Sequence, residues 1–75
     1  MTVHFSSLND VREFVSLATL ENYEIHVVDG DHTVNATSFM EMFTLDFSRP
    51  LSVRIERGKE SQFAQAARKF LVASA

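Results

Sequence analysis

The chain has 75 residues, with seven Lys and Arg against ten Asp and Glu and a formal net charge of −3. A chain of this length buries only about 60–65% of the surface that its unfolded form exposes, which leaves room for a single domain spanning residues 1–75. Because there is no cysteine, disulfides, thiolate metal sites and a cysteine nucleophile are excluded. Scattered basic residues argue against nucleic-acid binding, and no apolar run indicates export or membrane insertion, so a cytoplasmic protein is expected.

The first half of the chain predicts a strand, a helix and a hairpin. Residues 2–5 and 23–28 alternate in polarity, as strands with one buried face do. Between them, polar N-cap residues precede an apolar stripe at helical spacing, which predicts a helix over residues 9–20. Asp29-Gly30 is typical of a two-residue type I′ turn, so residues 32–36 are expected to fold back as an antiparallel strand.

The second half predicts a short helix over residues 39–43, a strand over 51–57 and a helix over 59–72. Gly58 separates the last two elements. The apolar stripe of the final helix is formed by Phe63, Ala66, Ala67, Phe70 and Leu71. The resulting order, β-α-β-β-α-β-α, predicts an α+β open-faced sandwich with a four-stranded antiparallel sheet and three helices on one face.

Two runs in this order carry a family resemblance: Glu24-Ile25-His26-Val27 before the hairpin, and Val34-Asn35-Ala36-Thr37-Ser38-Phe39-Met40-Glu41-Met42 after it. Over residues 7–57 the chain resembles HPr, the histidine-containing phosphocarrier protein of the bacterial sugar phosphotransferase system. The second run is similar to the family's "V-N-x-K-S" segment, which opens its short second helix. The resemblance implies a protein related to sugar transport that works by contacting other proteins.

The chain departs from the family at the phosphocarrier site. HPr proteins carry G-x-H-A-R-P at the start of their first helix, where the His accepts a phosphoryl group. Here Ser7 occupies the His position, Asn9 the Arg position and Asp10 the Pro position. Serine has no imidazole for a labile phosphoramidate and a carboxylate repels phosphate, so we expect a protein that is not a phosphocarrier. Two alternatives stay open: phosphotransfer on a relocated residue such as His4, or a degenerate domain unconnected with sugar transport.

Ser38 stands at the position where many family members are phosphorylated by a dedicated serine kinase. The chain also resembles a regulatory branch of the family that lacks the phosphocarrier His, keeps this serine and binds a transcription regulator. A phosphate at this position would meet backbone N–H groups. The simpler interpretation is that Thr37 and Ser38 are helix caps, because Ser and Thr rank high among N-cap residues. The sequence therefore predicts either a regulatory phosphorylation site or a structural cap.

Phe39, Met40, Met42 and Phe43 are too many large apolar residues for one short helix to bury. By resemblance, Phe39, Met40 and Phe43 correspond to the surface with which HPr proteins dock onto enzymes and regulators. The predicted partner is a protein, either a phosphotransferase-system component or a transcription regulator. In the alternative interpretation, Met42 and Phe43 complete the core and the other two are isolated exposed residues.

No enzyme signature is present, and no cofactor is expected. His4, His26 and His32 fall on outward strand positions without a partner at metal-ligand spacing, so no metal site is predicted. The carboxylates near the helix start and the turn are explained as helix-terminal and turn residues.

Overall fold

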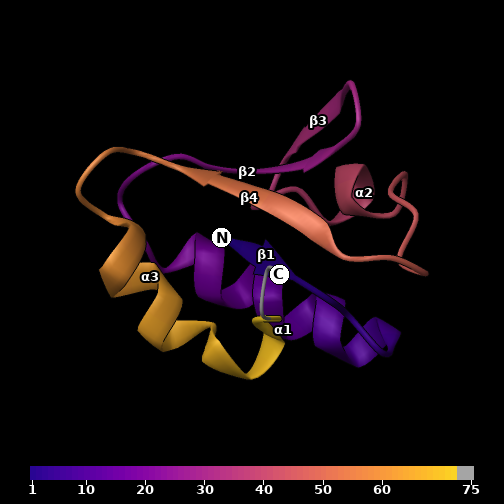
Figure 1. Ribbon diagram of the computed structural model, residues 1–75, viewed down its shortest axis with the longest axis horizontal. Helices are drawn as coiled ribbons and strands as arrows, with labels where there is room; N and C mark the ends of the chain where they lie inside the picture. The colour runs from indigo at the N-terminus through magenta and orange to yellow at the C-terminus, as the bar shows by residue number, and fades with distance from the viewer. Residues whose placement is uncertain (73–75) are drawn as a thin grey trace.

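The computed structural model describes residues 1–72 and contains a four-stranded antiparallel sheet (Figure 1). The strand order is β1-β4-β2-β3, so the two longest strands, β2 and β4, lie side by side in the middle. The strands are β1 (Thr2–Val3), β2 (Ile25–Asp29), β3 (His32–Asn35) and β4 (Leu51–Ile55). Helices α1 (Leu8–Thr19) and α3 (Glu60–Ala66) cover one side of the sheet, and α2 (Phe39–Met42) lies beside β3. The expected α+β open-faced sandwich is confirmed.

The strands have one buried face and one wet face, as their alternation predicts. Ile25, Val27 and Val53 are buried on the helix side of the sheet. On the other side, the register places His26 opposite Arg54 across the middle of the sheet.

Helix α1 begins at Leu8, one residue before the expected start, because Ser7 is the residue that caps it. The Ser7 hydroxyl accepts a hydrogen bond from the Asp10 backbone N–H at 3.2 Å. The Asp10 carboxylate in turn accepts from the backbone N–H of Ser6 at 2.9 Å. Reciprocal bonds of this kind satisfy donors that the first helical turn leaves free.

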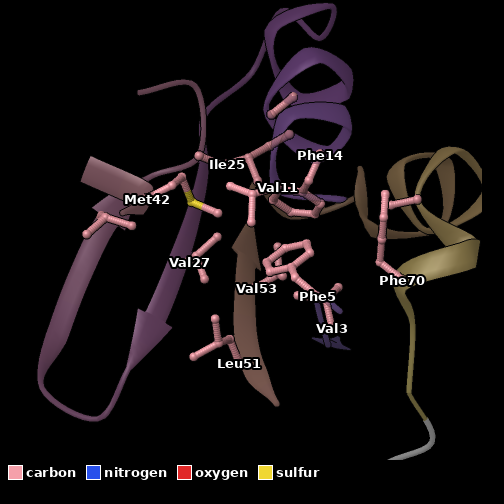
Figure 2. Close-up of a cluster of buried hydrophobic side chains, with 14 of the residues drawn as sticks. Val3, Phe5, Val11, Phe14, Ile25, Val27, Met42, Leu51, Val53 and Phe70 are labelled. Atoms are coloured by element: carbon pink, nitrogen blue, oxygen red, sulfur yellow. The ribbon is translucent and has the colours of Figure 1, made fainter. Parts of the chain in front are cut away.

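Edge-to-face aromatic contacts organise the core between α1, α3 and the sheet (Figure 2). The ring of Phe14, which is fully buried on α1, lies 5.0 Å from that of Phe5 and 5.6 Å from that of Phe63, centroid to centroid. Phe5 also contacts Phe70, at 5.6 Å. Because Met42 of α2 points into the same cluster, all three helices share one core.

The hairpin forms, but the predicted turn is wrong by one residue. Asp29 pairs with His32, so the two turn residues are Gly30 and Asp31 rather than Asp29 and Gly30. Of these two turn residues, only Gly30 has a positive φ, of 64°. A type I′ turn requires positive φ at both central residues, whereas glycine at the first central position is typical of type II′.

The predicted last helix, residues 59–72, is also wrong in its second half. Helix α3 ends at Ala66 and is followed by a single 3-10 turn, η1 (Arg68–Phe70). Leu71 then has an extended backbone and forms an antiparallel bridge with Val3 of β1. Phe63, Ala67 and Phe70 are nonetheless buried, whereas Ala66 of the predicted stripe is exposed.

Backbone hydrogen bonds to β1 explain why the chain leaves the helix. The N–H of His4 donates to the carbonyl of Phe70 at 2.9 Å, and the N–H of Val72 donates to the carbonyl of Thr2 at 3.0 Å. A strand edge presents backbone groups that need partners when they are covered by other parts of the chain. Phe70 and Val72 provide these partners, and residues 70–72 thereby cover the outer edge of β1.

The other boundaries differ from the predicted ones by one or two residues at an end, within the usual spread of such assignments. The first strand ends at Val3 rather than Phe5, and β2 runs from Ile25 to Asp29 rather than over 23–28. The remaining elements that are shorter than predicted are β3, α2 and β4.

Candidate protein-binding surface on helices α1 and α2

Helix α2 is held at its start by bonds to strand β3. Its N-cap, Ser38, accepts a hydrogen bond from the Glu41 backbone N–H at 3.3 Å, and the Ser38 N–H donates to the Asn35 carbonyl at 3.0 Å. The Glu41 carboxylate accepts from the Asn35 N–H at 3.1 Å. Both backbone groups of Asn35 are therefore bonded to α2, which shields this part of the sheet edge.

The apolar side chains of α2 divide between the core and the surface. Met42 is fully buried, whereas Met40 is 83% exposed and Phe43 is 46% exposed. Phe39 is half-buried, and its ring packs edge to face on that of Phe43 at 4.6 Å. Of the two residues that the alternative interpretation places in the core, Met42 lies there and Phe43 does not.

Helix α1 adds two residues to this surface that sequence reasoning missed. The Arg12 guanidinium lies over the Phe39 ring, 5.8 Å from its centroid. Leu8, four residues earlier on the same helix, is 58% exposed. A shallow hollow between the helices is lined by Arg12, Val15, Ser16 and Phe39. We call the surface formed by Leu8, Arg12, Phe39, Met40 and Phe43 the α1–α2 face.

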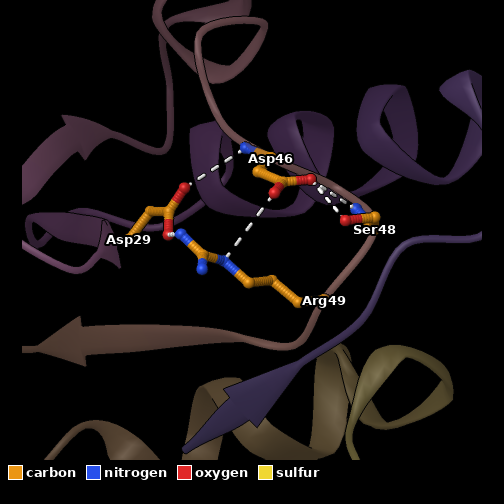
Figure 3. Close-up of polar contacts among 4 residues, drawn as sticks. All are labelled: Asp29, Asp46, Ser48 and Arg49. Atoms are coloured by element: carbon orange, nitrogen blue, oxygen red, sulfur yellow. Dashed lines mark hydrogen bonds and ion pairs between the residues drawn. The ribbon is translucent and has the colours of Figure 1, made fainter.

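Polar contacts fix the loop that follows α2 (Figure 3). Arg49 forms an ion pair with Asp29, which also accepts a hydrogen bond from the Asp46 N–H at 3.3 Å. Asp46 accepts from the hydroxyl of Ser48 at 2.6 Å and from its N–H at 3.0 Å. These two bonds, together with nearby Arg49, lower the pKa of Asp46. The contacts tie the end of β2 to the loop and so hold α2 in place.

A second contact between the hairpin and α2 runs through Thr44. Its hydroxyl donates to the Glu41 carbonyl at 2.6 Å, and its oxygen lies 2.7 Å from Nε2 of His32. Because the Thr44 hydroxyl proton is donated to the Glu41 carbonyl, the bond to His32 requires its Nε2–H to donate to the Thr44 oxygen. The hairpin tip therefore lies next to the end of the α1–α2 face.

Ser7, which the resemblance to HPr places at the position of the phosphorylated His, is the N-cap of α1. The Ser7 hydroxyl faces the Asp10 N–H, and the Asp10 carboxylate bonds to the neighbouring Ser6. Asn9, which the same resemblance places at the position of the Arg, donates to Glu13 at 3.4 Å. A phosphoryl group on Ser7 would therefore meet a carboxylate. His4 is half-buried, and no side-chain hydrogen bond or ion pair links it to the other described residues.

The open face of the sheet carries a second shallow hollow. It is lined by Glu24, His26, Thr33, Arg54, Ile55 and Glu56. Charges of both signs surround it, which gives no clear preference for an anion or a cation. Within residues 1–72, no three His, Asp or Glu side chains come together as metal ligands would. No helix in this part of the chain is long and apolar enough to cross a membrane.

Tyr23, in the segment between α1 and β2, is part of the buried core. Its side chain is buried, and its hydroxyl has no hydrogen-bond partner in the described part of the chain. Burial, followed by the nearby carboxylates of Glu21 and Glu56, raises the pKa of Tyr23 to about 12. The Glu21 carboxylate is not hydrogen-bonded to the Tyr23 hydroxyl, so it raises the Tyr23 pKa through its negative charge. Glu21 accepts a hydrogen bond from Gln62 of α3 at 3.1 Å. These contacts join the start of β2 to α3.

Neither a scan of protein-family models nor a search of curated proteins gives a match to this sequence.

Proposed function

We propose that this chain is an HPr-like protein that is not a phosphocarrier and acts as a protein-binding or regulatory module related to the bacterial sugar phosphotransferase system. The family part of the proposal is supported by the order of elements and by the register of the two runs at residues 24–27 and 34–42. In this proposal the partner is a phosphotransferase-system component or a transcription regulator, met in the cytoplasm.

The exposure of α2 is the observation that carries the binding half of the proposal. Scattered exposed apolar residues are ordinary on any protein surface, but here Met40 and Phe43 lie on one short helix beside Phe39. Leu8 on α1 adds a fourth apolar side chain. Methionine adapts to differently shaped surfaces, and aromatic residues contribute strongly to binding energy. This composition favours a docking surface.

The loss of phosphocarrier activity is supported by the site around Ser7. A hydroxyl cannot form a phosphoramidate, and the Asp10 carboxylate beside it disfavours added negative charge. Arg12 is stacked on Phe39 and belongs to the α1–α2 face.

Ser38 is the proposed site of regulation. A phosphate there would stand beside Phe39 and Met40 and near the Glu41 carboxylate, so it would change both the charge of the α1–α2 face and the bond from Glu41 to Asn35. Incubation with an HPr serine kinase and ATP should add one phosphate to the wild type and none to Ser38→Ala. A mass increase in both proteins, or in neither, would remove this half of the proposal.

The docking surface is tested by comparing two exposed apolar residues. Met40 and Leu20 are 83% and 80% exposed, but Leu20 caps the far end of α1, outside the α1–α2 face. Partners captured from a lysate by the wild type should be lost with Met40→Ser and kept with Leu20→Ser. Equal capture by the two variants would show that the face is wrongly assigned.

A further inference from the structure

The net charge of the protein is concentrated at one end of the molecule. Residues 29–49 contain four carboxylates and one cation, a balance of −3 that equals the charge of the whole chain. The carboxylates are Asp29, Asp31, Glu41 and Asp46, and the cation is Arg49. Outside this segment six carboxylates balance six Lys and Arg, so the remaining residues have no net charge. We call residues 29–49 the acidic end.

The acidic end is also one region in space. Asp29 contacts both Asp46 and Arg49, and His32 at the hairpin tip contacts Thr44 after α2. Figure 1 shows the hairpin tip, α2 and the loop before β4 gathered on one side of the molecule, away from α3. The α1–α2 face therefore borders the region that carries the excess negative charge.

Two of these carboxylates are free to act on a partner. Asp31 and Glu41 are exposed residues without an ion pair among residues 1–72, whereas Asp29 is paired with Arg49. The Glu41 carboxylate uses one oxygen on the Asn35 N–H, which leaves its charge uncompensated. Exposed charges of one sign attract oppositely charged partners and raise their rate of association.

We propose that the partner of the α1–α2 face is a basic apolar peptide segment. Its apolar side chain lies against Phe39, Met40 and Phe43, and its Lys or Arg side chains lie near Glu41 and Asp31. This inference rests on the proposed docking function and adds the chemistry of the partner.

Other surfaces indicate no occupant as clearly. The hollow on the open face of the sheet is lined by Arg54 as well as by Glu24 and Glu56. The hollow between α1 and α3 is bordered by Glu13 and Lys69, which pair with each other at 2.6 Å. The α1–α2 face has exposed apolar side chains and, although its own charged residue is Arg12, it borders the acidic end with its charge of −3.

The test uses a random peptide library displayed on phage and selected on the wild-type protein. Peptides that also bind Met40→Ser are removed, so the remaining ones require the α1–α2 face. We expect these to be enriched in Lys and Arg around an apolar residue. Synthetic copies should bind more tightly at about 0.01 M than at about 0.15 M salt, because the screening length falls from about 30 Å to about 8 Å.

Two double variants with the same change of charge then locate the attraction. Asp31→Asn with Glu41→Gln reduces the charge of the acidic end from −3 to −1 and keeps an oxygen for the Asn35 N–H. Glu24→Gln with Glu60→Gln removes the same charge from exposed positions outside it. Affinity at low salt should fall about three- to tenfold for the first pair, as expected for two nearby charges in water. The second pair should stay within about twofold, because its charges lie farther from the bound peptide and Coulomb attraction weakens with distance.

The outcomes separate this inference from the docking function on which it rests. Selected peptides that are acidic or uncharged, or that bind both double variants equally, would overturn the basic partner while leaving the face intact. Failure to obtain any peptide that depends on Met40 would overturn the docking function itself.

Discussion

The acidic end of the molecule and the end formed by α3 are built on the same sheet but handle their aromatic residues differently. At the α3 end, Phe63 and Phe70 are buried against Phe14. At the acidic end, Phe39 and Phe43 pack on each other at the surface, next to exposed Met40. The α3 end therefore has its aromatic rings in the core, whereas α2 at the acidic end buries Met42 and leaves Phe39, Met40 and Phe43 at the surface. This difference can be tested by substitutions on both sides.

The largest expected effect is at Phe14. Phe14→Ala should lower the free energy of unfolding by about 3–5 kcal/mol, because it removes a fully buried ring and leaves a cavity. Met40→Ala, on an 83% exposed side chain, should change it by less than about 0.5 kcal/mol. Urea unfolding measures both, and similar losses would contradict the division between core and binding face.

A smaller effect is expected where the end of the described chain covers β1. Val72→Pro removes the N–H that donates to the Thr2 carbonyl, whereas Val72→Ala keeps it. The proline variant should be less stable than the alanine variant by about 1–3 kcal/mol, since the Thr2 carbonyl loses its partner. Urea unfolding of the pair provides the comparison. Equal stability would show that this bond contributes nothing.

Tyr23 predicts an effect confined to alkaline pH. It is the only tyrosine and the chain has no tryptophan, so ultraviolet absorbance reports its ionisation directly. Because burial and nearby carboxylates raise its pKa from 10.0 to about 12, the folded state holds the proton more tightly than the unfolded state. The contribution of Tyr23 to the free energy of unfolding should be fully present below pH 10 and should be lost as the pH rises from 10 to about 12.

Two variants separate the causes of this decline. Tyr23→Phe should abolish the part of the alkaline decline that belongs to Tyr23, and Glu21→Gln should lower the Tyr23 pKa. A phenol that titrates at 10.0 in the folded protein would contradict its burial.

The smallest expected effect is at the loop that holds α2. Arg49→Ala should cost about 0.5–1 kcal/mol, because Arg49 is itself exposed, although its partner Asp29 is mostly buried. Arg49→Lys keeps the charge and is the matched control. The loss should shrink as salt is added. A loss that is independent of salt would mean that packing, rather than charge, holds the loop.

Secondary structure could be predicted correctly where it depends only on residues that are close together along the chain. Alternation in residues 51–55 and the stripe at Val11, Phe14 and Ala18 depend only on neighbours along the chain. The last helix was overpredicted because its end depends on a distant strand: Val72 and Phe70 bond to β1. No pattern within residues 59–72 contains that information.

The turn and the binding face show the same limit. Asp29 belongs to β2 rather than to the turn, and its carboxylate holds Arg49 and the Asp46 N–H, twenty and seventeen residues away. Met40 was recognisable because α2 is short, whereas Arg12 joins the face through its contact with Phe39, and Leu8 lies about one helical turn before Arg12 on α1. Leu8 and Arg12 are four residues apart and lie off the buried stripe of α1, so the sequence indicates only that they are neighbours on the exposed side of the helix.

We propose as the central point that this chain is an HPr-like domain that does not carry a phosphoryl group and binds proteins through the α1–α2 face. The most direct measurement is intact mass after incubation with phosphoenolpyruvate and Enzyme I, with a phosphocarrier HPr as the positive control. The account predicts a phosphate on the control and none on this protein. An acid-labile phosphate on this protein, lost in His4→Ala, would contradict it and make the chain a phosphocarrier with relocated chemistry.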